Sequence, residues 1–150
     1  MNGAVTLGTL DGANVEISNL VGKDNACIFG MKEEEVKKIK FENSYNPWDI
    51  YNEDSRIKEV MDSLVDGTFS SDKDQFRMIF DEIMYRNDEF MVLKDMDSYL
   101  LGCEKIESWY KDRDAWGKKC LINVAKSGWF SSDRTISEYN RDIWHLRKLH

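Results

Sequence analysis

A glycine-rich turn near the start of the chain is the first stretch whose residue types could do chemistry. The segment Gly8–Gly12 follows a short apolar run and precedes an expected helix, and helix N-termini often bind phosphate groups. Its spacing fits neither the dinucleotide-binding pattern nor the P-loop pattern, and Asp11 would put a carboxylate where the anion would bind. The sequence therefore favours a tight turn in which Asp11 caps the following helix.

Cysteines and histidines give no metal pattern. Cys27, Cys103 and Cys120 lack the spacing of zinc ligands, and His145 and His150 stand close to the last residue. Cys103 and Cys120 fall on apolar helix faces, which favours core positions. An odd number of distant cysteines is unlike an oxidised secreted scaffold, so we expect three buried thiols in a reducing cytoplasm.

Two further groupings have ordinary structural explanations. Ser131, Asp133 and His145 are the residue types of a hydrolytic triad, but nothing in the sequence holds them in geometry, and Ser132 and Asp133 have an ordinary role in capping a helix. Asp112 and Asp114 lack the remaining ligands of a calcium loop. Neither grouping predicts a site.

A set of aromatic residues could form a platform that stacks on sugar rings. Most of them fall on inward helix faces or at helix ends, so core packing is the favoured interpretation. The set consists of Trp109, Tyr110, Trp116, Trp129 and Phe130.

Composition narrows the class of protein. The 150 residues are 41% hydrophobic and include five tryptophans, which indicates a folded domain with a real core. The net charge of −7 argues against nucleic acid or an anionic membrane as a general partner. The sequence shows no apolar run of ~20 residues and no signal-peptide pattern, so we expect no membrane association.

The elements that must position these residues change in character along the chain. Apolar runs predict parallel strands at Ala4–Leu7, which Gly8 ends, and at Ala26–Phe29. A helix that stops at Gly22 joins them, and a charged helix with Val36 and Ile39 on its apolar side follows over 31–40. The β-α-β part thus covers about residues 1–40.

A helical part is expected over about residues 46–147. Pro47 suits the first turn of a short helix, and Gly67 and Gly128 suit helix ends. Five amphipathic patterns follow, with expected starts near residue 57, at the capping box Ser71-x-x-Asp74, at Asp95, at Asp114 and at Ser131 or Ser132. The inward faces of two of them are expected to hold Tyr99, Leu100, Cys103, Ile106 and Tyr110, and Ile136, Tyr139, Ile143 and Trp144.

A block that contains the first turn resembles a signature of the α-glucan phosphorylases, the family of glycogen, starch and maltodextrin phosphorylases. The resemblance runs almost without departure through Asn2-Gly3-Ala4-Val5-Thr6-Leu7-Gly8-Thr9-Leu10-Asp11-Gly12-Ala13-Asn14-Val15-Glu16. In that family the block follows closely on a lysine that holds pyridoxal phosphate as a Schiff base, and the phosphate contacts also precede it. The resemblance therefore places the cofactor lysine just before Met1.

A second motif resembles the C-terminal signature of the same family. It consists of Phe130-Ser131-Ser132-Asp133-Arg134-Thr135-Ile136, followed by Tyr139, Ile143 and Trp144. Read from its residues it is a capped helix start, in which Asp133 complements the helix dipole and Arg134 could pair with a carboxylate of a partner. Phe29-Gly30-Met31 and Asp88-x-Phe90 also resemble family segments, so the resemblance covers nearly the whole chain.

The resemblance implies that residues 1–150 are the C-terminal portion of the cofactor-binding domain of a phosphorylase. The fold would be α/β and mostly helical, part of a Rossmann-like domain in a two-domain glycosyltransferase of the GT-B type. The parent would carry out reversible phosphorolysis of α-1,4-glucans to glucose 1-phosphate, with α-glucan and phosphate as its substrates. The cofactor's own phosphate would transfer the proton.

For the chain alone the same reasoning predicts an inactive fragment that binds no cofactor. We assign no catalytic, cofactor-binding or metal-binding residue to it, because Lys23, the nearest lysine, lies in an expected loop and has no reason to be desolvated. Missing strands would leave apolar surface around Val5, Leu7, Ile28 and Phe29, which predicts self-association. The alternative is a stand-alone helical binding module derived from a phosphorylase gene.

Overall fold

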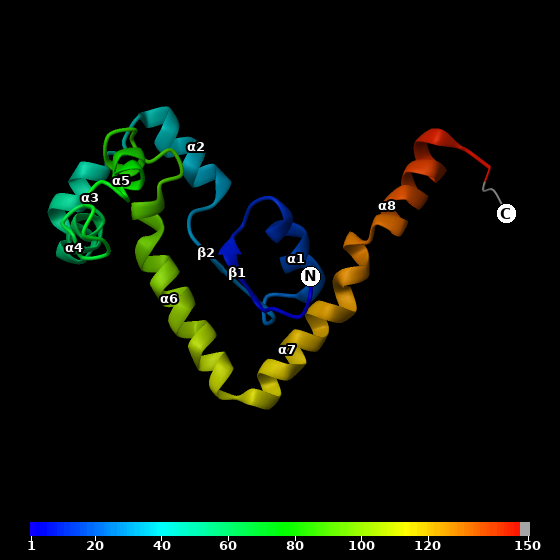
Figure 1. The fold of residues 1–150 in the computed structure, drawn as a ribbon. Coiled ribbons are helices and arrows are strands. Elements are labelled where there is room, and N and C mark those ends of the chain that lie inside the picture. The colour runs from blue at the N-terminus through cyan, green and yellow to red at the C-terminus, as the bar shows by residue number, and fades with distance from the viewer. Residues whose placement is uncertain (148–150) are drawn as a thin grey trace. The chain divides into compact units, whose positions relative to one another are not determined.

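The chain is a mostly helical α/β structure with two short parallel strands (Figure 1). It is a computed structural model that describes residues 1–147. It divides into two compact units. The first unit consists of Met1–Ile28 together with the residues from Gly102 onward, and the second unit consists of Phe29–Leu101. None of the helices in the described residues is long and apolar enough to cross a membrane.

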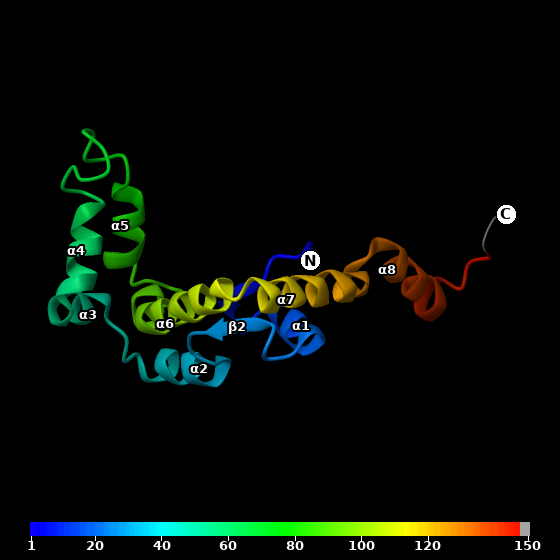
Figure 2. The ribbon, with the colours of Figure 1, turned by 90° about the horizontal axis from the view of Figure 1, so that it is seen from below.

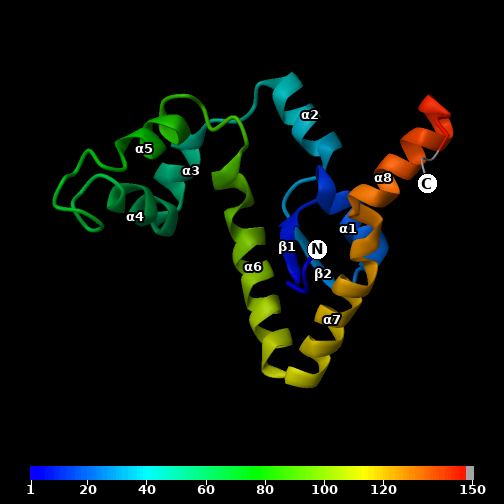
Figure 3. The same ribbon diagram turned by 45° about the vertical axis from the view of Figure 1, so that its right-hand side comes forward.

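The first unit begins with the predicted strand–helix–strand order. Strand β1 (Thr6–Thr9) leads into helix α1 (Ala13–Val21), and strand β2 (Ala26–Phe29) pairs with β1. The predicted stop at Gly22 is confirmed, since that residue follows α1 with φ +83°. Figure 3 shows α1 lying beside helix α7 (Arg113–Lys126), on which it packs.

The predicted position of the first strand is wrong by two residues. We expected Ala4–Leu7 with a break at Gly8, whereas β1 covers Thr6–Thr9 and contains Gly8. Apolar character alone suggested the earlier run, but a strand forms where its partner offers ladder hydrogen bonds. Pairing with β2 therefore decides the register.

Three short helical elements follow α7 in the first unit. A 3₁₀ turn η1 (Ser127–Phe130) leads to helix α8 (Ser132–Tyr139) and to a π-helical turn η2 (Asn140–Trp144). The main contacts of α8 are with η1 and η2, its neighbours in sequence. Its expected inward residues are exposed, so that prediction is wrong: Ile136, Tyr139, Ile143 and Trp144 all lie on the surface.

The second unit is helical and has one small core. Helices α2 (Glu33–Glu42), α3 (Pro47–Glu53), α4 (Ser55–Ser63) and α5 (Arg77–Met84) precede the long helix α6 (Val92–Lys111). Figure 2 shows α4 and α5 side by side above α3. The buried core residues come from α4, α5 and α6: Ile57, Met61, Phe80, Met84 and Leu93, with Trp48, Ile50, Tyr51 and Met96 packed around them.

Several helix boundaries agree with the sequence. Pro47 occupies the first turn of α3, where its missing N–H costs nothing. Ser131 caps α8 by accepting the N–H of Arg134 at 3.2 Å. The charged helix predicted at 31–40 is α2, with Val36 and Ile39 half-buried.

Three predicted helix starts are wrong. The Ser71-x-x-Asp74 pattern lies in a loop, and α5 begins only at Arg77. Asp95 lies inside α6 rather than ahead of it. Asp112, not Asp114, caps α7 by accepting the N–H of Ala115 at 3.0 Å.

The faces of α6 also differ from the prediction. Tyr99, Leu100 and Tyr110, which we placed inward, are exposed, whereas Cys103 and Ile106 are half-buried. The ring of Tyr99 still packs edge-on against Phe29, with 5.3 Å between centroids. A helical pattern identifies an apolar face but not whether another element covers it.

Candidate functional site

The turn between β1 and α1 is closed by its own side chains. The Thr9 hydroxyl donates to Asp11 Oδ1 at 3.0 Å, and the side-chain amide of Asn14 donates to the Thr9 carbonyl at 3.0 Å. A Cβ at Gly8 would lie 2.5 Å from Asn14 Nδ2, so glycine lets that amide approach. These contacts support the interpretation of Gly8–Gly12 as a tight turn.

The predicted capping role of Asp11 is wrong. The residue at the N-cap of α1 is Gly12, with φ +47°, and no side chain caps this helix. The Asp11 carboxylate is engaged with Thr9 instead. A carboxylate at this place opposes an anion, so the turn itself offers no phosphate site.

A buried asparagine ties the segment before β1 to α7. The Gly3 N–H donates to Asn123 Oδ1 at 2.9 Å, and Asn123 is only 2% exposed. Gly3 has φ +99°, and a Cβ on it would lie 3.3 Å from Val124 Cγ2. Sequence reasoning missed this contact, although a lone amide between Ile122 and Val124 in an apolar stretch was a usable signal.

The lysines of residues 1–147 lie mainly at the surface. Among the described residues every lysine is exposed except Lys119, which is half-buried. Its ammonium donates to the Asp24 carbonyl and lies 4.1 Å from the Trp109 ring centroid. A Schiff-base lysine needs a desolvated amine, and no described lysine occupies such a place; Lys23 is exposed as well.

The motif around Ser131 is held together locally. The guanidinium of Arg134 lies 3.5 Å from the Trp129 ring centroid and donates to the Trp129 carbonyl at 2.5 Å. It also pairs with Glu138 at 2.8 Å, one turn along the same helix. Arg134 therefore has an internal carboxylate rather than the partner carboxylate that we considered.

The residues of the weaker candidates are not brought together as sites. Ser131 and His145 stand at opposite ends of α8 and η2, and Asp133 lies exposed in the first turn of α8. No group of three His, Cys, Asp or Glu side chains within residues 1–147 could hold a metal ion. His150 lies outside the described residues.

The three cysteines are free, but only Cys27 is fully buried. Its thiol lies 3.8 Å from the Gly102 carbonyl, and burial raises its pKa above the ordinary value. A thiol with a raised pKa is protonated at neutral pH and is a poor nucleophile. Cys103 and Cys120 are half-buried, so the expectation of three buried thiols is correct for one.

The aromatic set divides between the interior and the surface. Trp109 and Trp116 are half-buried, and Trp116 meets Tyr110 edge-on with 5.2 Å between centroids. Tyr110, Trp129 and Phe130 are exposed, so core packing is the wrong interpretation for these three.

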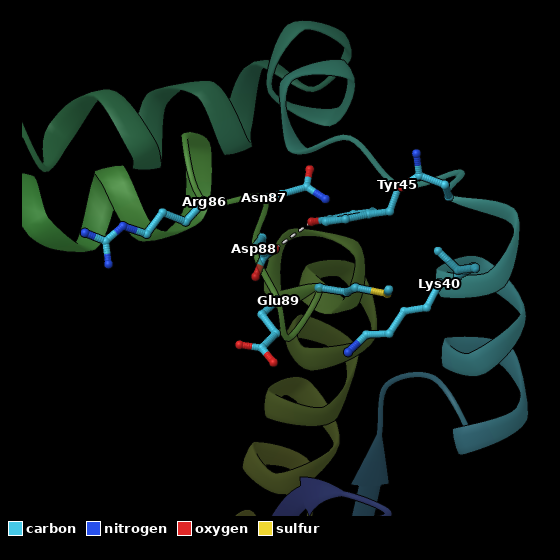
Figure 4. A pocket seen from close by; sticks show the side chains of 9 residues that line it. Lys40, Tyr45, Arg86, Asn87, Asp88 and Glu89 are labelled. Atoms are coloured by element: carbon cyan, nitrogen blue, oxygen red, sulfur yellow. Dashed lines mark hydrogen bonds between the residues drawn. The ribbon is translucent and has the colours of Figure 1, made fainter.

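The structure contains a pocket of about 330 Å³ that sequence reasoning missed. It lies in the second unit, between the end of α2 and the loop that precedes α6 (Figure 4). Tyr45 crosses it: its hydroxyl donates to Asp88 Oδ2 at 2.6 Å (Figure 4). The lining residues are Ile39, Lys40, Asn43, Tyr45, Arg86, Asn87, Asp88, Glu89 and Met91.

Asp88 is the centre of this pocket wall. The residue is 4% exposed, and its Oδ2 also accepts the N–H of Leu93 at 3.0 Å near the start of α6. Burial, followed by the hydrogen bond to Asp88, raises the pKa of Tyr45 well above its ordinary value. The Tyr45 hydroxyl therefore keeps its proton and acts as a donor across the neutral pH range.

Comparison with known proteins gives the family. The family model Phosphorylase, described as carbohydrate phosphorylase, matches residues 1–146. Glycogen phosphorylase of Bacillus subtilis (strain 168) is 44% identical over 149 residues, which are 99% of this chain and 19% of the relative. Maltodextrin phosphorylase of Streptococcus pneumoniae serotype 4 is 42% identical over 148 residues, 97% of this chain and 19% of the relative.

A mammalian relative shows the same coverage. Glycogen phosphorylase, muscle form, of Rattus norvegicus is 39% identical over 147 residues, 97% of this chain and 17% of the relative. The chain thus spans less than a fifth of the length of the curated relatives that it matches. It belongs to the carbohydrate phosphorylase family.

Proposed function

We propose that this chain is the C-terminal portion of an α-glucan phosphorylase and that it acts as part of that larger enzyme. The observation that carries the proposal is the match of residues 1–146 to the family, together with relatives that are about five times as long. The parent carries out reversible phosphorolysis of α-1,4-glucans to glucose 1-phosphate, in the cytoplasm. Its substrates are an α-glucan and inorganic phosphate.

The fold proposed for the parent is a two-domain glycosyltransferase of the GT-B type. In it, this chain supplies the last part of the second, Rossmann-like domain. The parallel pair β1–β2 with its joining helix supports this proposal, because Rossmann-like domains are built from strand–helix–strand units. Boundaries of about 1–40 for the β-α-β part and 46–147 for the helical part remain part of the proposal.

Pyridoxal phosphate would supply acid–base chemistry through its phosphate in the parent. The chain's own contribution is positioning: Asn123 holds the segment before β1 against α7 through Gly3. The described lysines are exposed or, in Lys119, engaged with Asp24 and Trp109. We therefore propose that the chain alone forms no defined adduct with the cofactor and has no phosphorolytic activity.

The decisive experiment transplants the chain into a relative. In Bacillus subtilis glycogen phosphorylase, the segment that matches this chain is replaced by residues 1–146, and the hybrid is assayed for glucose 1-phosphate from maltodextrin and phosphate. Activity in the hybrid, and none in the same enzyme with the segment deleted, is the expected result. A soluble hybrid that contains bound cofactor but produces no glucose 1-phosphate contradicts the proposal.

The chain alone is tested in parallel. After incubation with pyridoxal phosphate and reduction with borohydride, mass spectrometry should find only scattered, substoichiometric labelling of lysines. Stoichiometric labelling of one lysine together with glucose 1-phosphate release from maltodextrin would show an active fragment. The relatives named above are phosphorylases, so they give the stand-alone module no support.

A further inference from the structure

We infer that the pocket around Tyr45 and Asp88 is a binding site for a neutral polyhydroxylated ligand of the size of a hexose unit. Its volume of about 330 Å³ lies at the lower end of the range of ligand pockets. The inference stands on the pocket itself and does not depend on the phosphorylase proposal.

The charges around the pocket favour a neutral ligand. Two cationic residues, Lys40 and Arg86, and two acidic residues, Asp88 and Glu89, line it. Figure 4 shows Lys40 reaching in from the α2 side, whereas Arg86 is directed away. A phosphate group would therefore meet two carboxylates with one facing ammonium group, and a cationic ligand would meet that ammonium.

The polar groups of the lining suit hydroxyl groups. Asn43 and Asn87 each carry a donor and an acceptor on one side chain, Glu89 accepts, and Lys40 donates. A sugar hydroxyl both donates and accepts, so neighbouring hydroxyls on one ring can satisfy such a mixed set. Tyr45, Ile39 and Met91 add apolar surface for the carbon face of the ring.

The wall of the pocket has an unusual backbone conformation. Asn87, Asp88 and Met91 have positive φ angles of 65°, 40° and 54°, which non-glycine residues rarely adopt. Hydrogen bonds hold them there: the Asp88 carbonyl accepts the Met91 N–H at 2.8 Å, and Asp88 Oδ2 accepts from Tyr45 and Leu93. Such conformations concentrate at ligand sites, where a fixed wall lowers the entropic cost of binding.

Affinity should be weak, because the side chains that would contact the ligand remain in water. The polar lining residues are all exposed: Lys40, Asn43, Asn87 and Glu89. Each hydrogen bond to the ligand therefore replaces a hydrogen bond to water. We expect a dissociation constant in the millimolar range. Binding at this level is measurable by NMR.

The test is a titration of the ¹⁵N-labelled chain with methyl α-D-glucopyranoside and maltotriose, followed by two-dimensional NMR. Saturable shifts are expected for the amide signals of Asn43, Asn87 and Glu89. Inorganic phosphate and spermidine at equal concentration are expected to give smaller, unsaturated shifts there. Tighter binding of either ion, saturable sugar shifts that centre on Trp109 or Trp129 instead, or no saturable shift with either sugar would overturn the inference.

Matched variants locate the contact. Lys40→Ala should weaken sugar binding about tenfold, the effect of losing one charge-assisted hydrogen bond, whereas Lys37→Ala on the same helix, outside the lining, should leave it unchanged. Asn87→Gly keeps the left-handed backbone, since glycine adopts that φ readily, and should weaken binding by removing only the amide. Equal binding by Lys40→Ala and Lys37→Ala, or undiminished binding by a folded Asn87→Gly variant, contradicts the assignment.

Discussion

Helices α4 and α8 have similar amphipathic patterns but opposite surroundings. The apolar face of α4 carries Ile57 and Met61, which are buried against α5 and α6 in the core of the second unit. The apolar face of α8 carries Ile136 and Tyr139, which are exposed although their spacing is equally helical. An amphipathic helix is stabilised mainly by what covers its apolar face, so the two helices should respond very differently to mutation.

The largest expected effect is the loss of a core side chain from α4. Met61→Ala should lower the free energy of unfolding by about 2–5 kcal/mol, because the 2%-exposed side chain leaves a cavity when truncated. Ile136→Ala in α8 should change it by less than about 0.5 kcal/mol, since that side chain is 53% exposed. Urea unfolding followed by circular dichroism measures both, and equal losses would remove the distinction between the two helices.

The second effect concerns α7, which, unlike α8, is hydrogen-bonded to a segment distant in sequence through Asn123 and Gly3. Asn123→Ala should lower the free energy of unfolding by about 1–3 kcal/mol, because the part-buried Gly3 N–H loses its acceptor. The amide of Gly3 should also exchange with deuterium much faster than in the unaltered chain. Lys126→Ala, an exposed substitution on the same helix, is the control. Unchanged Gly3 exchange in the Asn123 variant would mean that α7 does not hold the segment before β1.

A smaller effect distinguishes the real cap of α7 from the predicted one. Asp112→Ala should destabilise by about 1 kcal/mol, since its carboxylate accepts the Ala115 N–H. Asp114→Ala, two residues later in the first turn, should stay within about 0.5 kcal/mol. Thermal unfolding of the pair compares them, and the reverse order would restore the assignment made from the sequence.

The smallest effect appears only in acid and again separates α4 from α8. The Arg56 guanidinium holds the pKa of the Asp54 carboxyl, which caps α4, at about 2. Because the pKa is lower when folded than unfolded, this stabilisation is complete above pH ~4 and is lost as the pH falls toward 2. Asp54→Asn should therefore flatten the acid dependence of unfolding.

The serine that caps α8 provides the comparison for that experiment. Ser131 accepts the Arg134 N–H with a hydroxyl that does not titrate, so Ser131→Ala should leave the slope of stability against pH between 5 and 2 as it was. A flattened slope in the Ser131 variant, or an unchanged slope in Asp54→Asn, would contradict the role given to Asp54.

Local chemistry made part of the molecule predictable. Gly22 ends α1 because glycine adopts positive φ easily, Pro47 starts α3, and Ser131 caps α8. Each depends on a few neighbouring residues and on backbone preferences that hold in any fold. The block of residues 2–16 and the motif around Ser131 likewise identified the family from order alone.

Contacts between residues distant in sequence decided the rest. The register of β1 depends on β2, the burial of Asn123 depends on Gly3 some 120 positions away, and the Tyr45–Asp88 bond spans 43 positions. Asp88 and Asp114 are both acids near helix starts, yet only the tertiary structure buries the first. Helical periodicity determined which residues share an apolar face, whereas burial requires a second surface, and that surface is present for α4 and not for α8 within residues 1–147.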